Sequence, residues 1–138
     1  MSVSSTPAET ERLAAELAAR LRPGDVVLVR GEMGAGKTTF VRGACRALGV
    51  TGPVTSPTFT IGQRYQGRAG SIAHLDLHRL ASLDDEDPAL LADYLEPGAI
   101  AFVEWPDAGG GELADRAAYD VTLRHAGGDA REVEVARR

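Results

Sequence analysis

The feature that most constrains the fold of this chain is an octapeptide, GEMGAGKT, at residues 31–38. It matches the pattern G-x-x-x-x-G-K-[ST], in which glycines let the backbone curl so that successive amide N–H groups face a phosphate. A short apolar run, Val26–Val29, precedes it, and a helical pattern with an apolar stripe follows it. This strand–loop–helix context favours a phosphate-binding loop (P-loop) over a glycine-rich turn that matches by chance.

A P-loop implies a nucleotide with its metal, and we expect magnesium-ATP or a close relative here. The ammonium of Lys37 can reach the β- and γ-phosphates, and the hydroxyl of Thr38 can ligate Mg²⁺. The N-terminus of the following helix adds a positive dipole end. The predicted nucleotide contacts are Met33, Gly34, Ala35, Gly36, Lys37, Thr38 and Thr39.

A magnesium-nucleotide site also needs a carboxylate, usually at the end of a buried strand. The apolar run Ile100–Val103 ends on Glu104, as in a Walker B strand with Glu in place of the commoner Asp. A second candidate, Asp76, lies between Leu75 and Leu77. We expect Lys37, Asp76 and Glu104 to be catalytic and Thr38 and Glu104 to hold the metal; the alternative for either carboxylate is a surface position at a strand end.

A loop after the second helix carries Thr55, Ser56, Pro57 and Thr58. Many P-loop proteins place a loop that senses the γ-phosphate at this point, although a simple proline turn is an equal alternative. Trp105, the only tryptophan, directly follows Glu104. A tryptophan there is more often a core or partner-contact residue than a catalytic one, but its position makes it a natural reporter of nucleotide state.

The remaining patterns alternate between strand and helix, which predicts an α/β fold in one domain spanning residues 1–138. Capping by Thr6 with Pro7 and Glu9 starts the first helix. The glycine run 109–111 is expected to be flexible. Further elements are expected as a first helix at about 7–21, a second helix ending at Gly49, paired strands at 59–65 and 72–77, an acidic helix entrance at 84–88, a short helix at 90–95 and a C-terminal hairpin at 119–135.

Charge and cysteine content narrow the class of protein. The net charge is −5 and Lys37 is the only lysine, which argues against direct high-affinity binding of nucleic acid. Cys45 is the only cysteine, which excludes an intrachain disulfide, and we expect it to be packed in the core. A secretion signal and an apolar stretch long enough to span a bilayer are both lacking, which predicts a cytoplasmic protein.

Four motifs in order give a resemblance to a known family. They are the P-loop, TSPTF at 55–59, HLDLHRL at 74–80 and VEWP at 103–106. The chain resembles the TsaE (YjeE) family, bacterial P-loop ATPases of tRNA threonylcarbamoyladenosine (t6A) biosynthesis. The resemblance implies a P-loop NTPase-like fold with a mixed sheet flanked by helices. It also implies ATP hydrolysis that is slow in isolation, and a complex with TsaD and TsaB that modifies adenosine 37 of tRNA.

Carried over by position, the resemblance makes Thr38 and Glu104 the magnesium ligands and Lys37 the phosphate lysine. It makes Asp76 an acidic residue important for hydrolysis and residues 55–58 a nucleotide-responsive loop, with Trp105 beside the site. The chain departs from the family at His78, where Tyr is usual, and this leaves the role of that side chain open.

Two other functions use the same loop. A small-molecule kinase would need an acceptor pocket and usually an arginine-bearing lid, and the sequence shows no dedicated lid segment. A non-catalytic, nucleotide-gated binding module would need no second carboxylate, so Asp76 and Glu104 argue mildly against it. A GTPase is less favoured, because the base-reading motif Asn-Lys-x-Asp does not occur.

Overall fold

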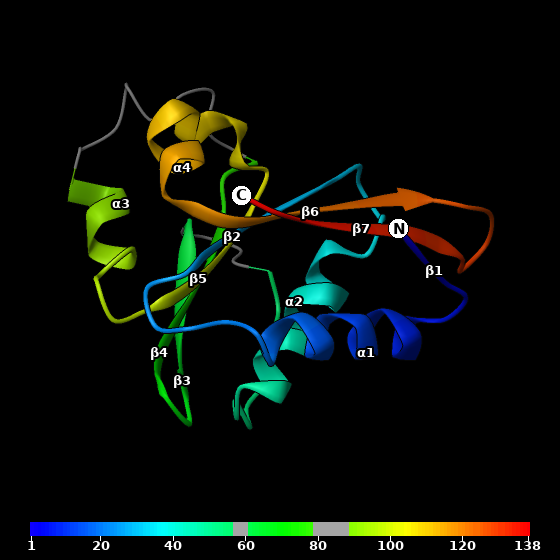
Figure 1. Cartoon of the computed structure of the whole chain (residues 1–138), viewed down its shortest axis with the longest axis horizontal. Coiled ribbons are helices and arrows are strands. Elements are labelled where there is room, and N and C mark those ends of the chain that lie inside the picture. The colour runs from blue at the N-terminus through cyan, green and yellow to red at the C-terminus, as the bar shows by residue number, and fades with distance from the viewer. Residues whose placement is uncertain (57–60, 79–88) are drawn as a thin grey trace.

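The computed structural model describes residues 1–56, 61–78 and 89–138. It forms a seven-stranded sheet with helices on both faces (Figure 1). The elements in chain order are β1 (Ser2–Ser4), α1 (Pro7–Ala18), β2 (Val26–Gly31), α2 (Lys37–Ala47), β3 (Gly62–Gly67), β4 (Gly70–Asp76), α3 (Ala89–Tyr94), β5 (Ile100–Glu104), the 3₁₀ helix η2 (Pro106–Gly109), α4 (Gly110–Arg116), β6 (Ala117–His125) and β7 (Arg131–Arg137).

The sheet is mixed, as the family resemblance implies. Its strand order is β1-β7-β6-β2-β5-β4-β3. The four central strands β6, β2, β5 and β4 are parallel, whereas β3 and β7 are antiparallel to their neighbours. The carboxyl ends of β2, β4 and β5 therefore meet at one edge of the sheet, which is where open α/β sheets bind ligands.

Two apolar clusters fill the space between the sheet and its helices. Helices α1 and α2 cover one face, where Leu17 and Phe40 pack against Val27 and Phe102. Helices α3 and α4 cover the other face, where Leu113 is part of the cluster. Successive residues of β2 point to opposite faces, and all four residues of Val26–Val29 are buried because both faces are covered.

Helix α1 begins as the sequence predicts. The hydroxyl of Thr6 accepts a hydrogen bond from the amide of Glu9 at 3.1 Å, and the carboxylate of Glu9 accepts one from the amide of Ser5 at 2.6 Å. The predicted end at residue 21 is wrong, because the helix ends at Ala18. The amides of Arg20 and Leu21 bond carbonyls three residues back, so the chain tightens into a 3₁₀-type turn there.

Helices α1 and α2 approach each other closely at Gly43. A Cβ atom at this position would lie 2.5 Å from Cα of Glu11 and 2.6 Å from its carbonyl oxygen. Glycine is therefore required at this helix crossing. The crossing holds α2, which begins at Lys37, in place against α1. Gly49, with φ of 97°, follows α2 in the left-handed conformation predicted for its C-terminal cap.

The paired strands and the C-terminal hairpin are confirmed, with different bounds. The paired strands are β3 and β4, and the hairpin extends over 117–137, with the whole of β7 paired to residues 119–125 of β6. The glycine run 109–111, expected to be flexible, lies in η2 and α4. The short edge strand β1 was not predicted. The predicted acidic helix entrance at 84–88 lies outside the described residues.

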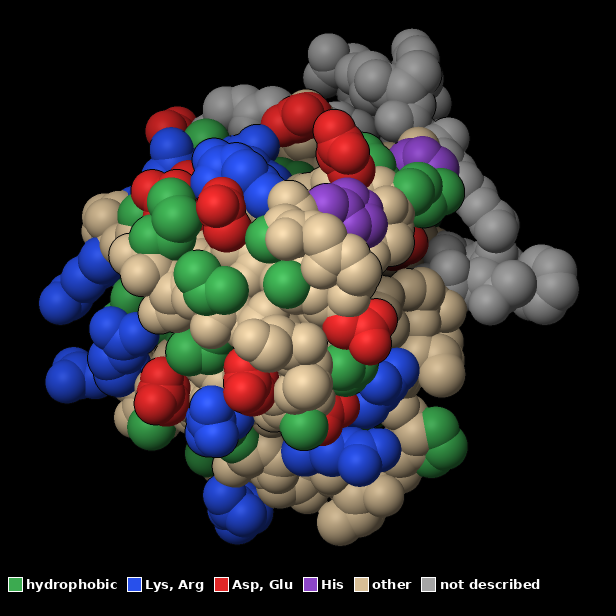
Figure 2. Space-filling model, turned by 90° about the vertical axis from the view of Figure 1, so that its right-hand side faces the viewer, with side chains coloured by type: hydrophobic (Ala, Val, Ile, Leu, Met, Phe, Trp, Pro, Cys, Tyr) green, Lys and Arg blue, Asp and Glu red, His purple; other side chains and the backbone are tan. Residues whose placement is uncertain are grey.

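The end of the molecule that carries the β6–β7 turn is shown in Figure 2. Basic and acidic side chains are intermingled on this face rather than gathered into a field of one sign. In the part of the chain that the structure describes, no helix is long and apolar enough to cross a membrane.

Candidate nucleotide site

The loop between β2 and α2 has the backbone conformation that its glycines permit. Gly34 has φ of 75° and Gly36, the residue before α2, has φ of 98°. Residues with a side chain rarely adopt such angles, because Cβ then crowds the backbone. The loop thus curls tightly and delivers the chain into the first turn of α2 at Lys37.

Lys37 is folded back onto its own loop. Its ammonium donates hydrogen bonds to the carbonyls of Gly31 at 2.7 Å and Glu32 at 2.9 Å, and the residue is only 5% exposed. Burial lowers the pKa of Lys37, while the nearby carboxylates of Glu104 and Asp76 act in the opposite direction. Lys37 is therefore a buried cation near both predicted carboxylates.

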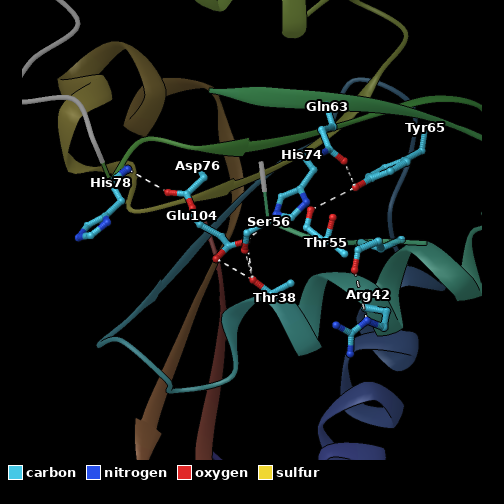
Figure 3. A network of polar contacts seen from close by, with 11 residues as sticks. Thr38, Arg42, Thr55, Ser56, Gln63, Tyr65, His74, Asp76, His78 and Glu104 are labelled. Carbon is cyan, nitrogen blue, oxygen red and sulfur yellow. Dashed lines mark hydrogen bonds and ion pairs between the residues drawn. The ribbon is translucent and has the colours of Figure 1, made fainter. Parts of the chain in front are cut away.

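Three side chains that carry oxygen meet at the start of α2 (Figure 3). Oγ1 of Thr38 lies 2.5 Å from Oγ of Ser56 and 3.3–3.4 Å from the two carboxylate oxygens of Glu104. Glu104 ends β5, the parallel neighbour of β2, so the sheet itself places the carboxylate beside the loop. The structure thus brings Thr38, Ser56 and Glu104 together from segments 18 and 66 residues apart.

Glu104 is held from behind by a buried histidine. Nε2 of His74 lies 2.5 Å from Oε2 of Glu104, and the two residues are 0% and 2% exposed. A carboxylate oxygen can only accept a hydrogen bond, so Nε2 carries the donated proton. Nδ1 of His74 is buried with no hydrogen-bond partner among the described residues. His74 therefore fixes the orientation of the carboxylate.

Asp76 lies at the end of β4, directly opposite Glu104 in the parallel register. It is partly exposed, and its Oδ1 accepts a hydrogen bond from the backbone amide of His78 at 2.9 Å. The structure thus places Asp76 at the same edge of the sheet as Glu104, but on the more open side of the site.

Trp105 has the side chains of a lysine and a histidine against its rings. The ammonium of Lys37 is 4.2 Å from the centroid of its rings, a cation–π distance, and the ring of His78 is 4.6 Å away, tilted by 31°. Trp105 has φ of 54° and is the only non-glycine residue with positive φ among those described. His78, where Tyr is usual in the family, thus places an aromatic ring against Trp105.

The other predicted site residues are distributed around this centre. Met33 is 66% exposed at the outer side of the loop, whereas Ala35 is fully buried. Thr39 is half-buried in the first turn of α2. In the predicted nucleotide-responsive loop, Ser56 contacts Thr38, while Thr55 is exposed and its carbonyl accepts a 3.4 Å hydrogen bond from Tyr65. Pro57 and Thr58 lie outside the described residues.

The residues at the start of α2 fit Mg²⁺ by their chemistry. Mg²⁺ prefers oxygen ligands and usually takes only one or two from the protein, with phosphates and water completing its octahedron. Thr38 and Glu104 supply a hydroxyl and a carboxylate that already approach each other. Within residues 1–56, 61–78 and 89–138, no group of three or more His, Cys, Asp or Glu side chains could hold a metal by itself. The site therefore suits an ion that arrives with its phosphates.

A pocket of about 480 Å³ adjoins the loop on the side of β6. Its wall includes Gly31, Glu32 and Trp105, so it borders the place where Lys37 lies. The remaining residues of its lining are Arg30, Pro106, Asp107, Thr122, Leu123, Arg124 and His125.

Sequence reasoning missed two side chains that contact the loop from the C-terminal hairpin. They are His125 and Arg131, which bond carbonyls of the loop 92–97 residues earlier in the chain. Neither lies in a recognisable motif, so no local signal could have found them.

Comparisons with known proteins agree with this geometry. The family model described as threonylcarbamoyl adenosine biosynthesis protein TsaE matches residues 4–133. A Bacillus subtilis protein named tRNA threonylcarbamoyladenosine biosynthesis protein TsaE is 35% identical over 127 residues, covering 92% of this chain and 78% of that protein. A Treponema pallidum protein of the same name is 35% identical over 121 residues, covering 88% and 87%. The crystal structure of Bacillus subtilis YdiB has a TM-score of 0.75 at 30% identity, covering 99% of this chain and 84% of YdiB. The chain belongs to the TsaE family, with the P-loop NTPase-like fold and mixed sheet of that family.

Proposed function

We propose that this chain binds magnesium-ATP at the P-loop and hydrolyses it slowly, as the ATP-dependent subunit of t6A37 formation with TsaD- and TsaB-type proteins. The observation that carries the proposal is the meeting of Lys37, Thr38 and Glu104 at the carboxyl edge of the sheet. Membership of the TsaE family supports the pathway, because relatives are named for tRNA threonylcarbamoyladenosine biosynthesis.

The side chains at the loop have distinct roles in this proposal. The ammonium of Lys37 leaves the carbonyls of Gly31 and Glu32 and neutralises charge on the β- and γ-phosphates. Thr38 and Glu104 hold Mg²⁺, which when bound withdraws electron density from the phosphate oxygens. His74 donates to Glu104 and keeps its carboxylate directed at Thr38. The amides of the loop and the N-terminus of α2 bind the remaining phosphate oxygens.

Asp76 is suited to orient the attacking water. It is the second carboxylate at this edge and is partly exposed. One of its oxygens accepts from the amide of His78, which holds the partly exposed carboxylate where water can reach it. An Asp76→Asn variant should therefore keep most nucleotide affinity and lose hydrolysis.

Charge supports a role in which other subunits hold the tRNA. The chain carries a net charge of −5, and basic and acidic side chains are intermingled on the face that bears the β6–β7 turn (Figure 2). Proteins that grip nucleic acid by themselves usually present a basic patch or stripe. We infer that tRNA is bound chiefly by TsaD- and TsaB-type partners and that this chain acts in the cytoplasm beside them.

The decisive experiment measures ATP hydrolysis by the purified chain alone and with TsaB- and TsaD-type proteins. We expect slow hydrolysis alone, faster hydrolysis in the mixture, and loss of both in Thr38→Ala. Thr51→Ala, an exposed loop threonine, is the matched control and should behave as wild type. Lack of stimulation together with lack of co-purification would contradict the proposal, and transfer of the γ-phosphate to a small acceptor instead of water would favour a kinase.

A further inference from the structure

The carbonyl groups on the outer side of the P-loop are held by the C-terminal hairpin. The guanidinium of Arg131, at the start of β7, donates from Nε to the carbonyl of Ala35 at 3.1 Å and from Nη2 to that of Gly34 at 3.0 Å. Nε2 of His125, at the end of β6, lies 3.1 Å from the carbonyl of Met33. Three consecutive carbonyls of the loop thus accept from two hairpin side chains.

The other carbonyls of the loop have partners within the loop and its helix. Those of Gly31 and Glu32 accept from Lys37, that of Glu32 also accepts from the amide of Ala35, and that of Gly36 accepts from Phe40. The hydrogen bonds to Gly31 and Glu32 come from the ammonium of Lys37, which must turn to the phosphates when a nucleotide binds. The hairpin contacts do not depend on it, so they can persist in both states.

Bonding the carbonyls from outside has a direct consequence for the amides. The peptide bonds are all trans among the described residues, so each C=O points opposite to the N–H of the next residue. Fixing the carbonyls of Met33 and Ala35 towards the hairpin therefore directs the amides of Gly34 and Gly36 away from it, into the loop. Amides directed inward are what bind phosphate oxygens in a P-loop.

Arg131 also ties the loop to the turn of the hairpin. Its Nη1 donates to the carbonyls of Gly128 and Ala130, both at 2.7 Å. One planar guanidinium thus joins two carbonyls of the P-loop to two of the β6–β7 turn, in a fork that a lysine ammonium cannot reproduce. Figure 1 shows the hairpin beside the segment that connects β2 and α2.

We propose that Arg131, with His125, is a positioning residue that holds the P-loop in its phosphate-binding shape from the C-terminal hairpin. The inference rests on the proposed function in that the shape serves a nucleotide. Neither residue touches the nucleotide in this proposal; both act through the backbone of residues 33–35.

The first test asks about the loop without nucleotide. Backbone ¹⁵N order parameters are measured for Gly34, Ala35 and Gly36 in wild type, Arg131→Ala and Arg137→Ala. Arg137 is an exposed arginine on the same strand and serves as the matched control. In Arg131→Ala we expect the values to fall from about 0.85 to below about 0.6, with Arg137→Ala unchanged. Unchanged order parameters in Arg131→Ala would overturn the proposal.

The second test measures affinity for magnesium-ATP by calorimetry. Arg131→Ala loses two hydrogen bonds from a charged group to the P-loop and should bind at least about tenfold more weakly, the factor for losing one such bond. Arg131→Lys keeps the charge but loses the fork, so it should also bind at least about fivefold more weakly. Affinity equal to wild type in Arg131→Lys would overturn the proposal, because charge alone would then explain the effect.

A conservative pair tests the histidine. His125→Gln keeps an N–H donor near the position of Nε2 and should bind within about twofold of wild type, whereas His125→Ala should bind a few-fold more weakly. If His125→Ala and His125→Gln both bound magnesium-ATP as tightly as wild type, His125 would have no part in holding the loop. If wild type bound no nucleotide, the proposed function would fail, while the order parameters would still decide whether the hairpin holds the loop.

Discussion

Replacing Glu104 by glutamine tests the metal site with little disturbance of the fold. Glu104 is 2% exposed and accepts from His74 at 2.5 Å. The amide oxygen of glutamine can still accept from His74, and its NH₂ group can face the hydroxyl of Thr38. Glu104→Gln therefore keeps the hydrogen-bond count and removes only the negative charge.

The loss expected in magnesium affinity follows from the strength of a contact to a charged group. Such contacts contribute about 1.5–3 kcal/mol. Losing one corresponds to an affinity for Mg²⁺ that is about 10- to 150-fold weaker. Glu104→Ala should lose the same metal affinity and also stability, because the buried N–H of His74 would be left without an acceptor at a cost of about 1–3 kcal/mol.

The assay titrates Mg²⁺ against ATP binding at fixed protein concentration, with urea unfolding measured in parallel. We expect Glu104→Gln to shift the magnesium titration while its urea midpoint stays near wild type, and Glu104→Ala to shift both. A magnesium titration of Glu104→Gln that overlays wild type would refute the assignment of Glu104 as a ligand.

Three further predictions concern packing, ionisation and the nucleotide response. Gly43→Ala should lower the free energy of unfolding by about 1–3 kcal/mol or more, because its Cβ would overlap the backbone of Glu11; urea unfolding checks this against Gly52→Ala, which meets nothing within 4 Å. Burial raises the pKa of Cys45 from 9.0 to about 12. The free energy of unfolding should therefore be unaffected by this thiol below about pH 9 and should fall between about pH 9 and pH 12, by at most about 4 kcal/mol, as the thiol ionises in the unfolded chain. In Cys45→Ala, the free energy of unfolding measured across that range should lack this fall with pH. Trp105 fluorescence should change saturably with magnesium-ATP, because its neighbouring ammonium moves to the phosphates; a flat titration despite binding measured by calorimetry would contradict this.

Local signals predicted the centre of the fold. The loop at 31–38, the apolar run before it and the apolar run that ends on Glu104 each depend on neighbouring residues in sequence, so their patterns could be interpreted directly. The structure confirms β2, α2 and β5 at these positions. The mixed sheet was predicted only from the family resemblance, because pairings between distant segments decide the order and direction of strands.

Elements that depend on distant partners could not be predicted. Strand β1 has only three residues, and it exists because β7 offers an edge to pair with. Helix α4 begins at Gly110 and Gly111, which weaken a helical pattern. The end of α1 at Ala18, where residue 21 was predicted, is set by a 3₁₀-type turn that apolar periodicity does not reveal.

The candidate site shows the same division. The P-loop pattern predicted Lys37 and Thr38, and the end of a buried strand predicted Glu104. Spacing in the sequence could not show that His74 makes a hydrogen bond to this carboxylate. The parallel register of β4 and β5 places His74 opposite Phe102, two residues before Glu104 and on the same face of the sheet. Likewise, only the folded hairpin brings Arg131 to the loop.

Calorimetric titration of ATP, with and without Mg²⁺, into the wild-type chain and Lys37→Ala tests the central claim most directly. We expect saturable binding near one nucleotide per chain, strengthened by Mg²⁺, and binding at least about 100-fold weaker in Lys37→Ala. No heat of binding in wild type, or equal affinity in the variant, would show that the loop does not hold the triphosphate.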